Sequence, residues 1–374
     1  MERPTPERRQ EIFRACARCL NGHGPRRIPA ELAALAAAAA LAGDTGPDIY
    51  GKGGALEALE RDVARLLGKP AAVFLPSGTM AQQIALRLHA ETARCQRVAF
   101  HPTCHLEVHE QRAYSELHGL EAHLVGRRDR LLELADLEAV GEPLAALLLE
   151  LPQRDLGGLL PSWAELSAQA DWARRRGVAL HLDGARLWEC APFYGKSYAE
   201  LAAPFDSVYV SFYKALGGIA GALLAGSEAL VAGARVWQRR HGGNLVSMYP
   251  YALSARVGLE RLGKMAEYHE RACRIAARWR SLAGVRVTPD PPHTNMFHVY
   301  VPVDGERLLG ASVQLAELES VALVTRTRAC DVPGFCAVEV SIGDAAAAFD
   351  DDELETLMRR LLECAQAPGS ATRK

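Results

Sequence analysis

Residues 144–182 contain the stretch that decides the fold. Residues 144–151, LAALLLEL, are almost continuously apolar, which is typical of a strand buried on both faces. Residues 163–176, WAELSAQADWARRR, have helical spacing and stop before Gly177, and residues 178–182, VALHL, form a second apolar run. Strand, helix and strand in this order favour two parallel strands joined by a crossover helix.

The same alternation continues on both sides of this stretch. A helix is expected over residues 79–90, and further short strands are expected at 71–75, 97–101, 208–211 and 221–225. The sequence therefore predicts an α/β fold with a mostly parallel sheet covered on both faces. After about residue 275 the pattern changes to a smaller α+β arrangement, with strands expected at 285–287, 297–301, 323–326 and 337–342.

These patterns divide the chain into three parts. Residues 1–44 form an N-terminal helical segment, with helices expected at 4–20 and 29–41. Residues 45–274 form the large α/β domain, and residues 275–374 form the small C-terminal α+β domain. Whether the N-terminal helices pack on the small domain stays open at this point.

Composition narrows the class of protein. The chain has 374 residues and a net charge of −2, so bulk charge indicates no nucleic-acid-binding surface. Its longest apolar run, residues 30–42, is too short to cross a membrane, and no secretory signal is visible. Nine scattered cysteines are typical of reduced thiols in a cytoplasmic protein. Cys16 and Cys19 have no second pair that could complete a metal site, so we expect no metal.

Three polar clusters follow the expected strands. Ser77, Gly78 and Thr79 open a helix, where unpaired N–H groups can bind a phosphate or form an ordinary helix cap. Asp183 can bind a metal, pair with a protonated ring nitrogen, or tie a loop through Arg186.

Lys214 follows an apolar strand and precedes two glycines. A lysine in such a place can lose its proton and attack a carbonyl group, although a lysine in a surface loop is the ordinary alternative. A phosphate site, then an acid at a strand end, then a lysine suggest a pyridoxal-phosphate site, because that cofactor needs all three parts.

The chain resembles the threonine aldolase and β-eliminating lyase family of fold-type-I pyridoxal-phosphate enzymes. The matching motifs occur in the family's order and are DIYG (48–51), AVFLPSGTM (72–80), HLDGARL (181–187), SFYKALG (211–217) and, more weakly, PHTNM (292–296). The resemblance implies an aspartate-aminotransferase-like large domain and pyridoxal 5′-phosphate as the cofactor.

The resemblance also implies roles for individual residues. Lys214 would be the Schiff-base lysine, Asp183 would pair with the ring nitrogen, and His105 would stack on the ring and act in catalysis. Arg186 would grip the substrate carboxylate, and Tyr50 would line the site of a neighbouring subunit. The other cofactor-binding residues would be Ser77, Gly78, Thr79, Gln153 and Ser211, with the phosphate held by residues 77–79 and helped by Ser211.

The chain departs from the family pattern in its substrate-binding segments. Gln153 occupies the place of a histidine that lies near the substrate hydroxyl in the aldolases. Glu339 lies near the place of a second carboxylate-binding arginine, for which Arg154, Arg326 or Arg328 could substitute. The chain therefore keeps the family's cofactor-binding motifs but differs from the family in its substrate-binding segments.

The leading prediction is a lyase that cleaves a β-hydroxy-α-amino acid to glycine and an aldehyde by retro-aldol chemistry. The alternatives are β-elimination to a 2-oxo acid and ammonia, and a binding or regulatory protein that keeps the cofactor pocket. We expect a small amino acid as the substrate, no nucleic-acid or membrane partner, and a homodimer or homotetramer with shared active sites.

Overall fold

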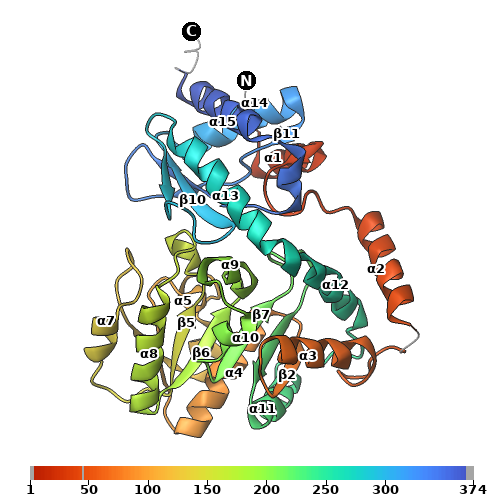
Figure 1. Ribbon diagram of the computed structural model, residues 1–374, viewed down its shortest axis with the longest axis vertical. Coiled ribbons are helices and arrows are strands. Elements are labelled where there is room, and N and C mark those ends of the chain that lie inside the picture. The colour runs from red at the N-terminus through yellow and green to blue at the C-terminus, as the bar shows by residue number, and fades with distance from the viewer. Residues whose placement is uncertain (1–3, 44–45, 368–374) are drawn as a thin grey trace. The chain divides into compact units, whose positions relative to one another are not determined.

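The computed structural model describes residues 4–43 and 46–367, whose packing forms two compact units (Figure 1). The large unit runs from Ile28 to Met265, and the small unit combines the residues before Ile28 with those from Ala266 onward. These units divide the N-terminal helical segment between them. The expected domain boundaries after residues 44 and 274 stay a prediction.

The large unit is built on a seven-stranded sheet with the order β2-β8-β7-β6-β5-β3-β4. Strands β3 to β7 pair in parallel, and β8 is antiparallel to both β2 and β7. The strands are β2 (Ala71–Leu75), β3 (Arg97–Phe100), β4 (Glu121–Leu124), β5 (Ala146–Glu150), β6 (Ala179–Gly184), β7 (Ser207–Ser211) and β8 (Ala222–Gly226). The mostly parallel sheet predicted from the sequence is present.

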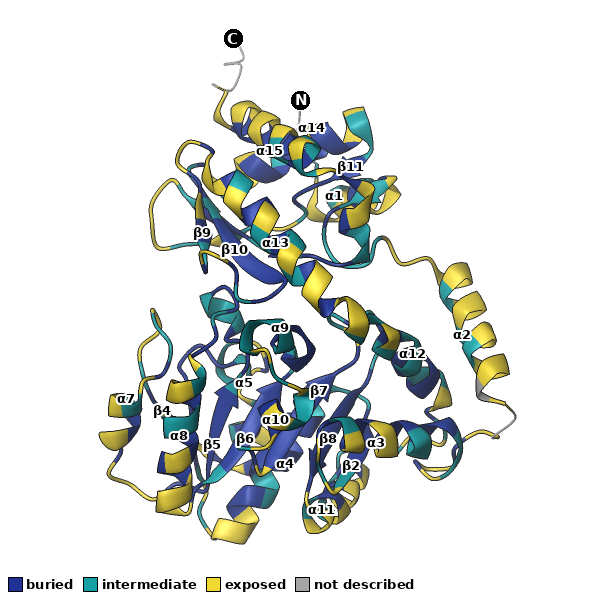
Figure 2. Cartoon of the chain, viewed as in Figure 1, coloured by how far each residue is buried: buried dark blue, intermediate teal, exposed yellow. Residues whose placement is uncertain are grey.

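Burial explains why the central strands are apolar throughout. Every residue of β7 and β8 is buried, and Figure 2 shows the central strands as a dark-blue layer between helices whose outer faces are yellow. The crossover helix α8 (Trp163–Arg176) begins with a capping box between Ser162 and Glu165 and ends at Gly177, whose φ of 64° suits glycine.

The remaining helices of the large unit follow the chain around this sheet. They are α2 (Ile28–Ala42), α3 (Gly54–Leu66), α4 (Gly78–Ala93), α5 (His105–Val108), α6 (Ala113–His118), α7 (Leu134–Glu138), α9 (Ala191–Tyr194), α10 (Tyr198–Ala202), α11 (Glu228–Arg240) and α12 (Tyr249–Leu259). Helix α2 packs against α12 and therefore belongs to the large unit.

The small unit combines a four-stranded antiparallel sheet with helices. Its sheet has the order β12-β13-β10-β9, from β9 (Arg286–Thr288), β10 (Met296–Val301), β12 (Arg328–Ala329) and β13 (Cys336–Ser341). Its helices are α1 (Pro6–Ala15), α13 (Met265–Arg280), α14 (Gly305–Glu319) and α15 (Asp351–Gln366), α13 starting at the last residue of the large unit. Helix α1 packs on α14, and β1 (Arg18–Cys19) pairs with β11 (Val321–Ala322), so the first N-terminal helix does pack on the small unit.

Two expectations for local structure were wrong. The strand expected over 323–326 is absent. Residues 321–322 pair with β1 instead, and residues 323–326 have no neighbouring strand to pair with. The helix expected over 4–20 ends at Ala15, and the following residues form β1 instead. Among the described helices, each is too short or too polar to cross a bilayer.

Candidate active site

A pocket lies in the large unit at the carboxyl ends of the parallel strands. This is the edge where open α/β sheets bind their ligands. Five of the residues singled out from the sequence line it together: Thr79, His105, Asp183, Arg186 and Lys214. The structure thus brings together residues that are up to 135 positions apart, between Thr79 and Lys214.

Four other predicted residues do not line the pocket themselves. Each is either near a lining residue in the sequence or hydrogen-bonded to one. Ser77 and Gly78 directly precede Thr79 at the start of α4. Gln153 hydrogen-bonds Glu150, which lines the pocket. Ser211 ends β7, is fully buried, and accepts a hydrogen bond from the Tyr213 N–H at 3.4 Å.

Tyr50 does not line the pocket. Its side chain is 51% exposed, and its N–H donates to the Val246 carbonyl oxygen at 2.9 Å. The expected role of Tyr50 in the site of a neighbouring subunit stays a prediction.

The start of α4 has the geometry of a phosphate site. The Ser77 hydroxyl caps the helix by accepting a hydrogen bond from the Met80 N–H, while the first N–H groups of a helix have no partner within it. Only glycine fits at position 78, because an added Cβ would lie 2.0 Å from the Tyr209 hydroxyl oxygen. This close approach holds the helix end against β7, with Thr79 at the pocket wall.

Lys214 has the environment of a reactive amine. Burial lowers its pKa, and the nearby Arg186 guanidinium lowers the pKa further, whereas Asp183 acts in the opposite direction. A lysine that loses its proton more easily is a better nucleophile toward a carbonyl group.

Asp183 and Glu150 place two carboxyl groups side by side. They are register partners on the parallel strands β6 and β5. Burial raises the pKa of Asp183, with Lys214 and the Ala185 N–H, 3.1 Å from Oδ1, opposing the rise. Burial and the neighbouring Asp183 raise the pKa of Glu150 to about 8. The two groups therefore titrate as a pair.

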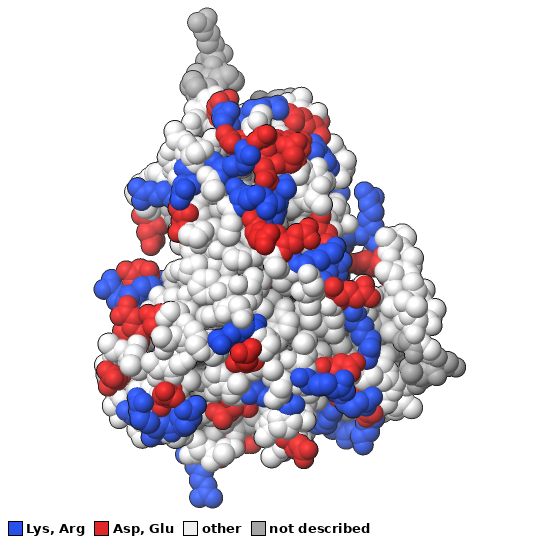
Figure 3. Space-filling view, viewed as in Figure 1, with Lys and Arg blue, Asp and Glu red and all other residues white. Residues whose placement is uncertain are grey.

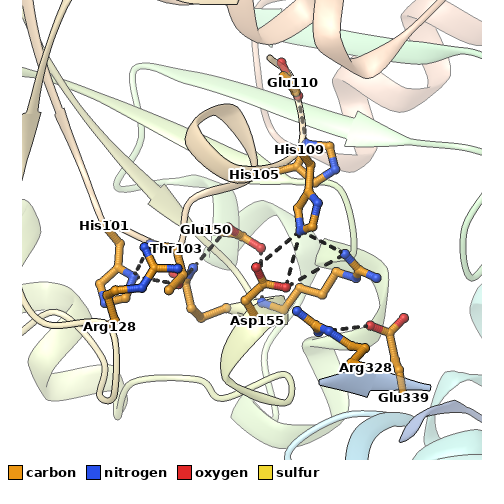
Figure 4. A network of polar contacts seen from close by, with 12 residues as sticks. His101, Thr103, His105, His109, Glu110, Arg128, Glu150, Asp155, Arg328 and Glu339 are labelled. Atoms are coloured by element: carbon orange, nitrogen blue, oxygen red, sulfur yellow. Dashed lines mark hydrogen bonds and ion pairs between the residues drawn. The ribbon is translucent and has the colours of Figure 1, made fainter. Parts of the chain in front are cut away.

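A chain of hydrogen bonds leads from Glu150 to buried residues that follow β3 (Figure 4). The Gln153 side-chain amide donates to Glu150 Oε2 and to Thr103 Oγ1, both at 3.1 Å. The Arg154 N–H donates to Glu150 Oε1 at 3.1 Å. His101 hydrogen-bonds Thr103 Oγ1 through Nδ1 at 2.8 Å. Gln153 therefore acts on the pocket through Glu150.

Arginines occupy two positions in the pocket wall. Arg186 is 12% exposed in its side chain and lies 3.6 Å from Glu189. Arg154 Nη1 lies 3.3 Å from His109 Nε2. The same nitrogen of His109 lies 3.2 Å from Asp155 Oδ2 (Figure 4). Both guanidinium groups suit the recognition of a carboxylate.

In the small unit, Glu339 on β13 lies beside Arg328 on β12, with Nη1 and Oε2 3.9 Å apart. Arg328 also approaches His298 Nε2 at 3.3 Å. Arg326 lines a separate groove within the small unit, next to α1. The structure thus pairs Glu339 with one of the three arginines considered as substitutes.

Sequence reasoning missed several pocket residues, namely Glu110, Glu150, Tyr209 and Tyr213, and considered Arg154 only as a substitute arginine. A single acid at the end of an apolar strand was the only local signal for Glu150. The described residues contain no group of three or more His, Cys, Asp or Glu side chains that could hold a metal ion.

Comparison with known proteins defines the family. The sequence matches the β-eliminating lyase family over residues 29–303. It is 35% identical to an aldolase of Penicillium aethiopicum over 272 residues, which cover 69% of each chain. It is 29% identical to the low-specificity L-threonine aldolase 1 of Arabidopsis thaliana, over 75% of this chain and 80% of that protein.

Solved structures agree with this assignment. A protein of Listeria monocytogenes EGD-E, provisionally assigned as an L-allo-threonine aldolase, is 43% identical, with a TM-score of 0.90 over 96% of this chain and 99% of that chain. A serine palmitoyltransferase of Sphingomonas wittichii, 17% identical, has a TM-score of 0.68 over 93% and 87% of the two chains and shares the fold alone.

The family match and the structural likeness define a lyase with the fold-type-I fold, in a family whose members characteristically use pyridoxal phosphate. Within that class, the chain belongs to the family of β-eliminating lyases and threonine aldolases. The resemblance, the fold class and the enzyme class predicted from the sequence are confirmed.

Proposed function

We propose that this protein uses pyridoxal 5′-phosphate to cleave a β-hydroxy-α-amino acid of the threonine class into glycine and an aldehyde. The observation that carries the proposal is the pocket itself, which joins a lysine, a buried carboxylate and a helix start. The names of the Arabidopsis and Listeria relatives support the same reaction and the threonine-like substrate.

The residues present fit the cofactor. The start of α4 offers Ser77, Gly78 and Thr79 for the phosphate, and Asp183 offers a buried carboxylate for the protonated ring nitrogen. Lys214, with its lowered pKa, is the amine that would hold the cofactor. When bound, pyridoxal phosphate supplies an electron sink for a bond broken at the substrate α-carbon.

The chain's own groups would then bind and deprotonate the substrate. Arg186, which lines the pocket, would hold the α-carboxylate through its planar guanidinium. His105, which lines the pocket, is the candidate base for the β-hydroxyl proton, since a neutral imidazole has a nitrogen lone pair that can accept a proton and the amide of Gln153 is not a base.

We also propose that the protein works as a homodimer or homotetramer in the cytoplasm. The segments around Ile49, Tyr50 and Val246 are joined by the Tyr50–Val246 hydrogen bond, and the three side chains are 64%, 51% and 63% exposed. Such an exposed apolar patch suits a contact with a second copy, which would bring Tyr50 to that copy's site. Charges of both signs are mixed over the face shown in Figure 3, which favours a protein or small-molecule partner over nucleic acid.

The proposed reaction is tested with a panel of amino acids. L-Threonine, L-allo-threonine, β-phenylserine, L-serine and L-cysteine are offered to the holoenzyme, and glycine plus aldehyde is assayed beside ammonia plus 2-oxo acid. We expect glycine and aldehyde from the β-hydroxy amino acids, and none from the Lys214→Ala variant. Ammonia and oxo acid as the dominant products, without glycine from any substrate, would establish β-elimination instead.

A further inference from the structure

A buried glutamate lies directly behind the imidazole that faces the pocket. Glu110 follows α5, and its side chain is 3% exposed, whereas that of His105 is 31% exposed. Glu110 Oε1 lies 2.9 Å from His105 Nδ1, and Figure 4 shows this contact at one end of the polar network. Both residues line the pocket.

The second oxygen of the same carboxylate is also held. The Gln83 side-chain amide, from the middle of α4, donates to Glu110 Oε2 at 3.1 Å. Gln83 is itself buried, with 1% exposure. The carboxylate is therefore fixed at both oxygens, by a helix on one side and by the imidazole on the other.

This arrangement determines which ring nitrogen carries the proton. An ionised carboxylate only accepts hydrogen bonds, so a neutral imidazole that faces one through Nδ1 donates from Nδ1 and keeps its lone pair on Nε2. A carboxylate behind a histidine fixes the ring orientation and makes the opposite nitrogen more basic, as it does behind metal-bound histidines. A buried carboxylate without such partners would be costly.

The chain contains a matched contrast. Glu107 lies three residues before Glu110, within α5, and its carboxylate accepts a hydrogen bond from the Tyr114 hydroxyl at 2.5 Å. Glu107 does not line the pocket and does not contact His105 in any described hydrogen bond. It is a structural acid on the same short segment.

We propose that Glu110, clamped by Gln83, is the positioning residue that makes His105 a base through its Nε2 atom. The role of His105 as a base rests on the proposed function, because that function supplies the β-hydroxyl proton that His105 removes. The positioning itself has a structural readout that does not depend on which reaction the enzyme performs.

The first experiment reads the tautomer. The holoenzyme is labelled with ring-¹⁵N histidine, and the signals of His105, among the twelve histidines, are identified by their loss in His105→Asn. We expect the proton on Nδ1 in the wild type and in Glu107→Gln. In Glu110→Leu, which removes the acceptor, we expect an Nε2–H form or a mixture. An unchanged tautomer in Glu110→Leu overturns the proposal.

The second experiment separates positioning from packing. Glu110→Gln keeps the shape and removes the charge, and we expect kcat for retro-aldol cleavage to fall about tenfold to hundredfold, with KM nearly unchanged. In the His105→Asn background the same change should cost less than about twofold, since the partner is gone. Glu107→Gln should stay within about twofold of the wild type. Equal losses from Glu110→Gln in both backgrounds overturn the proposal.

A further variant covers the case in which the Glu110 variants do not fold. Gln83→Leu keeps both His105 and Glu110 but removes the hydrogen-bond donor to Glu110 Oε2. We therefore expect kcat to fall a few-fold when His105 is present and to stay nearly unchanged in the His105→Asn background. An equal loss with His105 absent contradicts the proposal. If the wild type cleaves no β-hydroxy amino acid, the proposed function fails, whereas the tautomer experiment still decides the positioning.

Discussion

Replacing Glu150 by glutamine should make the protein more stable in alkaline solution. Glu150 lies at the end of β5 beside Asp183, and burial with the neighbouring carboxyl raises its pKa from 4.5 to about 8. The folded protein therefore keeps a proton on Glu150 over a pH range in which the unfolded chain has released it. The contribution of Glu150 to the free energy of unfolding therefore falls as the pH rises through this range.

The size of the effect follows from the two pKa values. A rise from 4.5 to about 8 corresponds to roughly 5 kcal/mol, at about 1.4 kcal/mol for each tenfold change in acid dissociation constant. Relaxation and water penetration reduce the cost of a buried charge, so we expect about 2–4 kcal/mol in practice. Glutamine does not titrate, so Glu150→Gln should gain this amount relative to the wild type between about pH 4.5 and pH 8 and then level off.

Urea unfolding of the cofactor-free protein, at one fixed protein concentration, measures the free energy of unfolding of Glu150→Gln and of the wild type. The difference between the two is compared at about pH 5 and about pH 8.5. Glu138→Gln, at an exposed acid of α7, is the control and should show no comparable pH dependence. Infrared difference spectra should also show a protonated carboxyl band near neutral pH that disappears in Glu150→Gln. A stability difference that is constant with pH, or that shrinks as the pH rises, would refute the reasoning.

Three further changes test the cofactor site. Borohydride reduction of the holoenzyme should fix the cofactor on Lys214, as read by mass spectrometry, and Lys214→Ala should lose the label; a label on another lysine would contradict the assignment. Asp183→Ala should bind the cofactor more weakly, and its kcat should fall about a hundredfold or more, because the ring nitrogen loses its charged partner. A nearly normal kcat would rule out the pairing of Asp183 with the ring nitrogen. Gly78→Ala should destabilise the protein by about 1–3 kcal/mol in thermal unfolding, because its Cβ would lie 2.0 Å from the Tyr209 hydroxyl oxygen and 2.5 Å from Cζ of the same ring. Full stability of Gly78→Ala would contradict the clash.

Periodicity predicted the buried elements well and the exposed ones poorly. Strand β2 and helix α8 have the predicted bounds, since each has a clear apolar pattern that packing in the large unit requires. Strand β4, whose sequence is EAHL, was missed because none of its four residues is buried, so its sequence has no apolar run, whereas the other edge strand, β2, is mostly buried. The run at 323–326 is apolar at its start and partly buried, yet apolarity does not specify a strand partner.

The residues of the candidate site also fall into two groups, those that a local sequence pattern predicts and those that it does not. Thr79, Asp183 and Lys214 could be predicted because a helix start or strand end places them at the pocket edge, and the family motifs name them. Glu110 and Glu150 could not be assigned, because a lone acid becomes informative only when its neighbours are known. For Glu150 that neighbour is 33 positions away in the sequence, at Asp183 on the next strand.

The coupling of these two carboxyl groups links the stability experiment to catalysis. Both Glu150 oxygens accept N–H hydrogen bonds, from Gln153 and from Arg154, which favours the ionised form, while burial and Asp183 favour the protonated form. Lys214 in turn favours an ionised Asp183. One proton shared by the pair leaves a single negative charge, which is what one protonated ring nitrogen needs. Removing the Asp183 carboxylate should therefore lower the pKa of Glu150, while burial still raises it, so the protonated-carboxyl band of Asp183→Ala should disappear at a lower pH than that of the wild type.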